Sequence, residues 1–129
     1  MINSISLPTK LSNEIESTAD FLEVSANSKI ISMGQQMTFI PFVKKGRVRV
    51  FIENNDIDKE QLLYYVNEGQ TCLMSMIASF GDKKSKVSAI TETDCEIITV
   101  SNSKVREWQK EYTEWNDLII DLFVMRYQE

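Results

Sequence analysis

Sulfur-bearing side chains are the most reactive groups that the sequence brings close together. Cys72, Met74 and Met76 lie within one short stretch, and such a stretch could sense redox changes or ligate a soft metal or haem. Cysteines and methionines also fill protein cores, and we favour that interpretation, for Cys95 as well. The chain contains no histidine, so it lacks the commonest general base and metal ligand. We therefore predict no catalytic residue, no metal site, no cofactor and no enzymatic activity.

The net charge of the chain bears on whether it can bind nucleic acid by itself. The net charge is −5, which weighs against an independent grip on nucleic acid, because non-specific affinity comes from lysine and arginine neutralising phosphates. Basic residues do gather on one predicted hairpin, at Lys44, Lys45, Arg47 and Arg49. They could contact DNA or a DNA-binding partner, but outward charges on a strand more often keep a sheet edge soluble, and we favour that interpretation.

The apolar pattern predicts one domain with a helix at each end and strands between. Helical spacing of Leu11, Ile15, Ala19 and Leu22 predicts a helix over residues 9–23. The period then changes to two, and Gly46 can supply the positive φ of a hairpin turn. Strands are expected at residues 29–33, 37–44, 47–53, 62–66, 86–90 and 96–100. Helices are expected within residues 71–80, after the Ser101-Asn102-Ser103 cap, and from Thr113 or Glu114 onward.

An apolar stripe follows the last predicted helix. It consists of Trp115, Leu118, Leu122 and Met125 at alternating three- and four-residue steps, widened by Ile119 and Phe123. Such a stripe can pack on its own domain or form a two-stranded coiled coil with a second subunit. Both arrangements can exist together if Trp108 and Trp115 face the domain and the last turns of the helix face a partner.

Four stretches, in this order and spacing, resemble the effector domain of the Crp/Fnr family of transcription regulators. They are residues 41–50 (PFVKKGRVRV), 63–72 (LYYVNEGQTC), 94–103 (DCEIITVSNS) and 115–118 (WNDL). The resemblance implies a mainly β fold, a jelly-roll (cupin-like double-stranded β-helix) barrel with an N-terminal helix and C-terminal helices. It divides the chain into a sensor domain over residues 1–112 and the start of a dimerisation helix over residues 113–129.

The same resemblance places the family's ligand-binding segment at residues 69–88. Relatives that bind a cyclic nucleotide hold the ribose with a glutamate and the phosphate with an arginine next to a short helix. In this sequence, Leu73, Met74 and Ser75 stand where Gly-Glu-Leu is expected, and Ser85 and Lys86 stand where Arg-Ser is expected. Lys83 and Lys84 could offer a substitute cation, or simply belong to a solvated loop. The predicted pocket residues are Gly69, Cys72, Leu73, Met74, Ser75, Ser85 and Lys86.

The resemblance also implies partners. It favours a homodimer through Trp115, Leu118, Ile119, Leu122 and Met125, and contact with DNA only through a C-terminal domain that this sequence does not contain, whether as a fragment or as a shortened protein. The absence of a long apolar run and of a secretory signal at the start predicts a cytoplasmic chain without membrane contact.

Four functions are therefore weighed. The favoured one is a regulatory sensor domain that answers to an unidentified effector but not to cyclic AMP or cyclic GMP. The second is a dimerisation or interaction module with a vestigial pocket, and a cyclic-nucleotide site of non-standard chemistry is less favoured. An enzyme on a cupin-like barrel is disfavoured, because its usual histidine ligands are missing.

Overall fold

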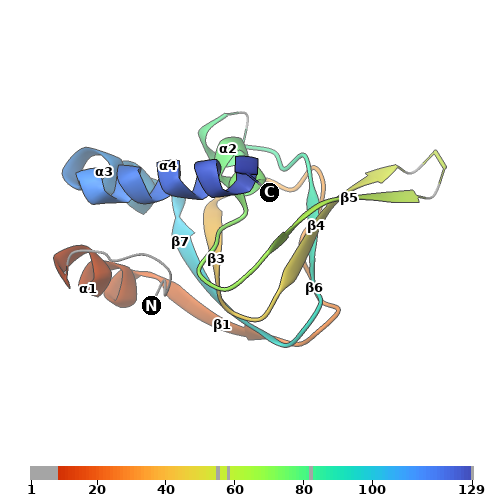
Figure 1. Cartoon of the computed structure of the whole chain (residues 1–129), viewed down its shortest axis with the longest axis horizontal. Coiled ribbons are helices and arrows are strands. Elements are labelled where there is room, and N and C mark those ends of the chain that lie inside the picture. The colour runs from red at the N-terminus through yellow and green to blue at the C-terminus, as the bar shows by residue number, and fades with distance from the viewer. Residues whose placement is uncertain (1–8, 55, 58, 82, 129) are drawn as a thin grey trace.

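The computed structural model describes residues 9–54, 56–57, 59–81 and 83–128 of the 129-residue chain (Figure 1). Helices α1, α3 and α4 gather beside one sheet, and the end of the β4–β5 hairpin points away from them. In chain order the elements are α1 (Thr9–Thr18), β1 (Asp20–Val24), β2 (Lys29–Ile31), β3 (Phe39–Lys45), β4 (Val48–Asn54), β5 (Lys59–Val66), α2 (Leu73–Phe80), β6 (Ser88–Thr91), β7 (Cys95–Ser101), α3 (Asn102–Glu111) and α4 (Thr113–Gln128).

The strands form two antiparallel sheets. The first has the order β1-β7-β3 and the second the order β2-β6-β4-β5. The mainly β fold class is therefore confirmed. The described strands do not join into one closed sheet, so the closed jelly-roll barrel goes further than the observed topology.

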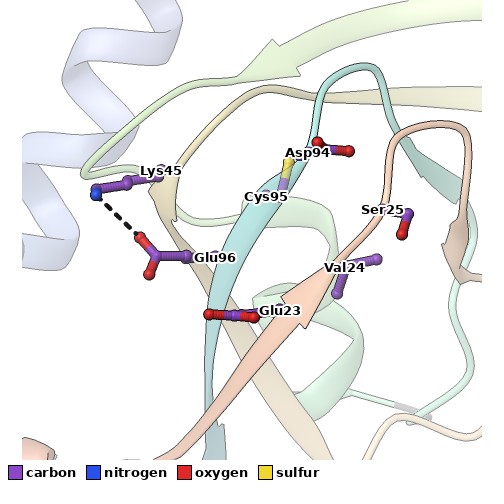
Figure 2. A pocket seen from close by; sticks show the side chains of 7 residues that line it. All are labelled: Glu23, Val24, Ser25, Lys45, Asp94, Cys95 and Glu96. Atoms are coloured by element: carbon purple, nitrogen blue, oxygen red, sulfur yellow. Dashed lines mark ion pairs between the residues drawn. The ribbon is translucent and has the colours of Figure 1, made fainter.

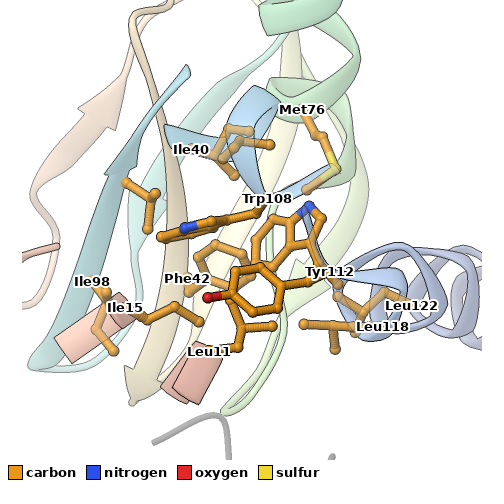
Figure 3. Close-up of a cluster of buried hydrophobic side chains, with 13 residues drawn as sticks. Leu11, Ile15, Ile40, Phe42, Met76, Ile98, Trp108, Tyr112, Leu118 and Leu122 are labelled. Carbon is orange, nitrogen blue, oxygen red and sulfur yellow. The ribbon is translucent and has the colours of Figure 1, made fainter. Parts of the chain in front are cut away.

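One apolar core lies between the three-stranded sheet and the helices (Figure 3). The indole rings of Trp108 and Trp115 meet edge to face with centroids 5.0 Å apart, and the Phe42 ring lies 5.9 Å from that of Trp115. Leu11 and Ile15 anchor α1 to the same core. The face of β3 and β7 that lies away from the second sheet is apolar and has to be shielded from water. The helices provide this cover.

A second apolar core lies between the two sheets. It takes side chains from both sheets and from α2, namely Ile31, Met37, Val43, Val48, Val50, Val66, Cys72, Ala78, Val87, Ala89, Cys95 and Ile97. The predicted alternation of β4 is confirmed, since Val48 and Val50 enter this core and Ile52 packs against it. Phe51 lies on the opposite face and is still fully buried, beneath the Arg49 guanidinium.

The predicted helix over residues 9–23 is correct only as far as Thr18. Residues 20–24 instead form β1, which pairs with β7 from Asp20 opposite Thr99 to Val24 opposite Cys95. Leu22 fits the helical spacing by coincidence, because its side chain is 48% exposed in the strand. Pairing with β7 is a long-range interaction, and such tertiary contacts override local spacing.

The other predicted elements are confirmed with shifted ends. The predicted strands at 29–33 and 37–44 become Lys29–Ile31 and Phe39–Lys45, and the last helix begins at Thr113. The predicted cap is also present, since the Ser101 hydroxyl accepts a hydrogen bond from the Lys104 N–H at 3.3 Å.

Glu14 joins α1 to the corner between α3 and α4. The Tyr112 hydroxyl donates to Glu14 Oε2 at 2.9 Å, and Lys104 Nζ lies 3.7 Å from Glu14 Oε1. The Trp108 indole N–H, followed by the Tyr112 hydroxyl, lowers the pKa of Glu14 from its ordinary value, although the indole makes no hydrogen bond of full geometry. The ionised carboxylate thus ties α1 to α3 and to Tyr112 just after it.

Gly46 occupies a position that no other residue fits. Its φ is +95°, and a Cβ there would lie 2.6 Å from Cys95 Sγ and 2.7 Å from the Asp94 carbonyl oxygen. We expect Gly46→Ala to lower the free energy of unfolding by about 3 kcal/mol, through the unfavourable φ and the clash together.

Gly34 is the matched control for this substitution. Its φ is +83° and a Cβ would meet nothing within 4 Å, so Gly34→Ala should cost only about 1 kcal/mol. Urea unfolding of both variants measures the difference. Equal losses at the two glycines would show that the close approach of Cys95 to Gly46 contributes nothing.

Candidate ligand site

The segment at residues 69–88 crosses from the end of β5 to the start of β6. Gly69 is buried with φ +81°, and its N–H donates to the Val43 carbonyl at 2.8 Å. The Thr71 hydroxyl then donates to the Pro41 carbonyl at 2.6 Å. These bonds fix the entrance of the segment to β3 before α2 begins.

The first turn of α2 is capped by a side chain that sequence reasoning missed. The Met74 N–H donates to the Tyr64 hydroxyl at 3.2 Å, and that hydroxyl lies 3.6 Å from Cys72 Sγ. Cys72 occupies the N-cap position without a side-chain cap of its own. A free helix N-terminus attracts phosphate through its N–H groups, but one of these groups is already bonded within the chain. Tyr64 carries no sequence signal for this role, because β5 and α2 meet only in the fold.

The far end of the segment is closed by serines. The Ser85 side chain is 3% exposed; its hydroxyl donates to the Val87 carbonyl at 2.6 Å and accepts from the Val87 N–H at 3.2 Å. The Ser88 hydroxyl donates to Glu53 Oε2 at 3.0 Å. The Lys29 ammonium, at 2.8 Å, followed by this hydroxyl, lowers the pKa of Glu53. Both hydroxyls therefore form hydrogen bonds within the protein itself.

The remaining predicted pocket residues do not converge on one point. Met74 packs against the core between the sheets, and Ser75 is fully buried. Lys86 is exposed to solvent. The side chain of Leu73 lies outside the described residues. No finding tests the assignment of these residues as a ligand site, which stays a prediction.

One small cavity between the sheets is formed by residues that the structure describes. It measures about 10 Å³ and is lined by Ile30, Ile31, Pro41, Val43, Val48, Val66, Cys72, Ala89 and Ile97. This volume is near the smallest that holds a single water, and ligand pockets usually measure about 300–1,000 Å³. Among the predicted pocket residues whose side chains are described, Cys72 alone lines it. None of these described lining residues carries a charge that could hold a ribose or a phosphate.

A larger, open pocket lies on the surface, at one end of the three-stranded sheet (Figure 2). It measures about 510 Å³ and is lined by Glu23, Val24, Ser25, Lys45, Asp94, Cys95 and Glu96. This pocket could not be predicted from the sequence, because the helical spacing placed Glu23 in a helix and not in a strand beside β7. Lys45 Nζ lies 3.5 Å from Glu96 Oε2 across the pocket.

Three of the four basic residues of the β3–β4 hairpin lie beside carboxylates, and the fourth, Lys44, lies 5.9 Å from the centroid of the Phe21 ring. Arg49 bonds Glu60 at 2.7 Å, and Arg47 lies 3.5 Å from Glu92 with its guanidinium over the Tyr65 ring. These contacts favour the interpretation that the charges keep the hairpin soluble. The sulfur groups are likewise internal, since Cys72, Cys95 and Met76 are core members and both cysteines are free.

The apolar stripe of α4 faces the chain's own core. Trp115, Leu118 and Leu122 are buried against the three-stranded sheet, and Ile119 packs beside them. The side chain of Met125 lies outside the described residues. A different face, formed by Ile120, Phe123 and Val124, is 40–59% exposed. Packing within the domain is thus observed for most of the stripe, and the predicted role of these residues in a dimer is untested.

Comparison with known proteins agrees with this arrangement. Residues 21–112 match the family model of the cyclic nucleotide-binding domain. The match covers most of the chain, and the chain belongs to this family.

Solved structures share the fold at low sequence identity. The catabolite activator protein of Thermus thermophilus is 15% identical with a TM-score of 0.78, over 95% of this chain and 56% of that one. A Crp/Fnr-family regulator from Eubacterium rectale is 19% identical with a TM-score of 0.77, over 95% and 56%. The sensor domain of the regulator DNR from Pseudomonas aeruginosa is 18% identical with a TM-score of 0.74, over 95% and 81%. The resemblance to regulator effector domains is confirmed at the level of the fold.

The chain spans little more than half the length of the Thermus and Eubacterium proteins. A search among curated protein sequences found no match. Among the described helices, none combines the length and apolarity needed to span a membrane.

Proposed function

We propose that this chain is the sensor domain of a Crp/Fnr-type transcription regulator and that it does not respond to cyclic AMP or cyclic GMP. Family membership and the shared fold support the first part. The cavity of about 10 Å³ between the sheets carries the second part. A nucleotide would have to open this core and displace the bond from Met74 N–H to Tyr64.

The proposed regulator has a DNA-binding part beyond this sequence. The reading frame past the codon for Glu129 tests it directly. About 80 further residues with a helix-turn-helix pattern are expected. A frame that continues into a catalytic or transport domain would contradict the regulator assignment.

A second candidate is a dimerisation or interaction module whose pocket has lost its ligand. The small volume of the described cavity favours this module as much as it disfavours nucleotide binding. Thermal unfolding against a panel of small metabolites separates the two candidates. A sensor is stabilised by its effector through mass action, whereas the melting temperature of a module without a ligand stays constant.

We further propose that residues 113–129 begin a dimerisation helix in a jelly-roll domain. Ile120, Phe123 and Val124 form one exposed apolar stripe on α4, at helical spacing. Trp115, Leu118 and Leu122 would then hold α4 in place from the other side. A partner helix would meet the exposed stripe, with Ile119 at its border.

The exposed stripe can be tested with one charge. Phe123→Glu is expected to weaken the dimer at least about tenfold in sedimentation equilibrium, because a carboxylate would be buried against an apolar partner. Ile77→Glu on α2 is the matched control, since Ile77 is 51% exposed on a different helix. A dimer weakened equally by both substitutions would contradict an interface on α4.

A further inference from the structure

β1 is an open sheet edge. It lies at the end of the order β1-β7-β3, and four of its five residues are exposed. Within the described part of the chain, its main-chain hydrogen bonds go to β7 alone. In an antiparallel pair the outer N–H and C=O groups of an edge strand point away from the sheet, where they can pair with another strand.

Three devices that commonly protect a sheet edge are absent from β1, although Asp20 and Glu23 place two charges on it. Phe21 and Leu22 are 50% and 48% exposed, and the strand contains neither a proline nor a lysine. Natural edges are commonly blunted by proline, lysine or a bulge, and the β1–β7 register runs without interruption from Asp20 to Val24. A strand added here would bury two large apolar side chains.

Three charged residues lie in one row across the sheet, and only two of them form an ion pair. Glu23 of β1 lies directly opposite Glu96 of β7, and Glu96 lies opposite Lys45 of β3. Like charges in directly opposed positions destabilise a sheet. Lys45 lies 3.5 Å from Glu96 Oε2, which accepts no hydrogen bond although it is buried. Glu23 has no cationic partner among the described residues.

The surface beside this row is hollow. The open pocket of about 510 Å³ (Figure 2) and an adjoining groove of about 240 Å³ share Glu23 and Glu96 as lining residues. The groove extends the hollow to Phe21 and to Lys44, whose ammonium lies 5.9 Å from the centroid of the Phe21 ring. A long side chain reaching over β1 would therefore find space beside two carboxylates, with Lys44 and Phe21 at the far end of the groove.

We propose that β1 is a docking edge for an extended segment of a partner protein, which pairs as a fourth strand and places a lysine or arginine opposite Glu23. The row of charges then runs from the partner's cation through Glu23 and Glu96 to Lys45. An apolar partner residue two positions along meets Phe21 on the same face. The inference is independent of any effector bound between the sheets.

A second copy of this chain is a poorer occupant. The charged residues of β1 are Asp20 and Glu23, so two β1 strands offer each other no cation. The net charge of −5 also opposes self-association. A basic segment from another protein fits both observations.

The test uses the full chain and a fluorescently labelled peptide, TVKVFVT, whose central motif sets lysine opposite Glu23 and phenylalanine opposite Phe21 in antiparallel pairing. Fluorescence anisotropy should show at least about fivefold tighter binding than for TVEVFVT, the difference expected from exchanging an opposite-charge pair for a like-charge pair. TVKPFVT, whose proline removes a main-chain donor, should bind more weakly than TVKVFVT.

The variant Glu23→Lys should reverse the preference in favour of TVEVFVT. It should also unfold at no lower temperature than the natural chain, because the repulsion from Glu96 is removed. Glu16→Lys, on an exposed position of α1, makes the same change in net charge and should leave the preference unaltered.

Changes in amide chemical shifts on adding the peptide show which sheet edge the peptide binds. Perturbations by TVKVFVT should centre on residues 20–24. The proposal is overturned by equal binding of the lysine and glutamate peptides, by no binding at millimolar peptide, or by perturbations centred on β5, the edge of the other sheet. Concentration-dependent self-association lost in Glu23→Lys would identify a second copy as the occupant and would also overturn it.

Discussion

Replacing Trp115 by alanine is expected to lower the free energy of unfolding by about 3–5 kcal/mol. The side chain is fully buried and packs between α3 and the sheet, with ring centroids 5.0 Å from Trp108 and 5.9 Å from Phe42. Its removal would leave a cavity where α4 meets the sheet. Since domains of this size have a total stability of about 5–15 kcal/mol, the loss is a large part of the whole.

Urea unfolding followed by circular dichroism measures this loss. Phe123→Ala is the control on the same helix, because Phe123 is 40% exposed and should cost below about 1 kcal/mol in a monomer. Similar costs at the two positions would mean that α4 is not held by the face we describe. The contrast therefore tests whether α4 is anchored through Trp115.

Ser85→Arg is expected to destabilise the chain by about 3–5 kcal/mol and to create no affinity for cyclic AMP. The substitution supplies the guanidinium that nucleotide-binding relatives are expected to have, but at a position that is 3% exposed. It also removes the hydroxyl that both donates to and accepts from Val87. The positive charge would be placed at this buried position before any ligand could pair with it.

Lys86→Arg is the matched control. Lys86 is exposed beside Ser85, so the same guanidinium there should change the stability by less than about 0.5 kcal/mol. Denaturant unfolding and a cyclic AMP titration of both variants give the two readouts. A stable Ser85→Arg protein that binds cyclic AMP would show that the core opens readily around this position.

Much of the fold could be predicted because its patterns are local. The alternation of Val48, Val50 and Ile52 and the turn at Gly46 depend on neighbouring residues, and both are confirmed. The identity of β1 could not be predicted in this way. Its pairing with residues 95–99 depends on contacts more than seventy positions away along the chain, and the helical spacing of Leu22 concealed it.

The candidate site was less accessible to sequence reasoning. The absence of a carboxylate at Met74 and of a guanidinium at Ser85 could be read directly. The capping of α2 by Tyr64 and the small volume of the described cavity between the sheets could not, because both depend on how β5, α2 and the sheets pack. The apolar stripe of α4 had two possible uses, and only packing showed that Trp115 and Leu118 face the domain.

Isothermal titration of the natural chain with cyclic AMP and cyclic GMP tests the central claim most directly. The claim is that the fold of a cyclic-nucleotide receptor is retained while its interior is closed to that ligand. Neither nucleotide is expected to bind with a dissociation constant below about 1 mM, which corresponds to about −4 kcal/mol. A saturable isotherm with one nucleotide per chain and a micromolar dissociation constant would contradict the claim.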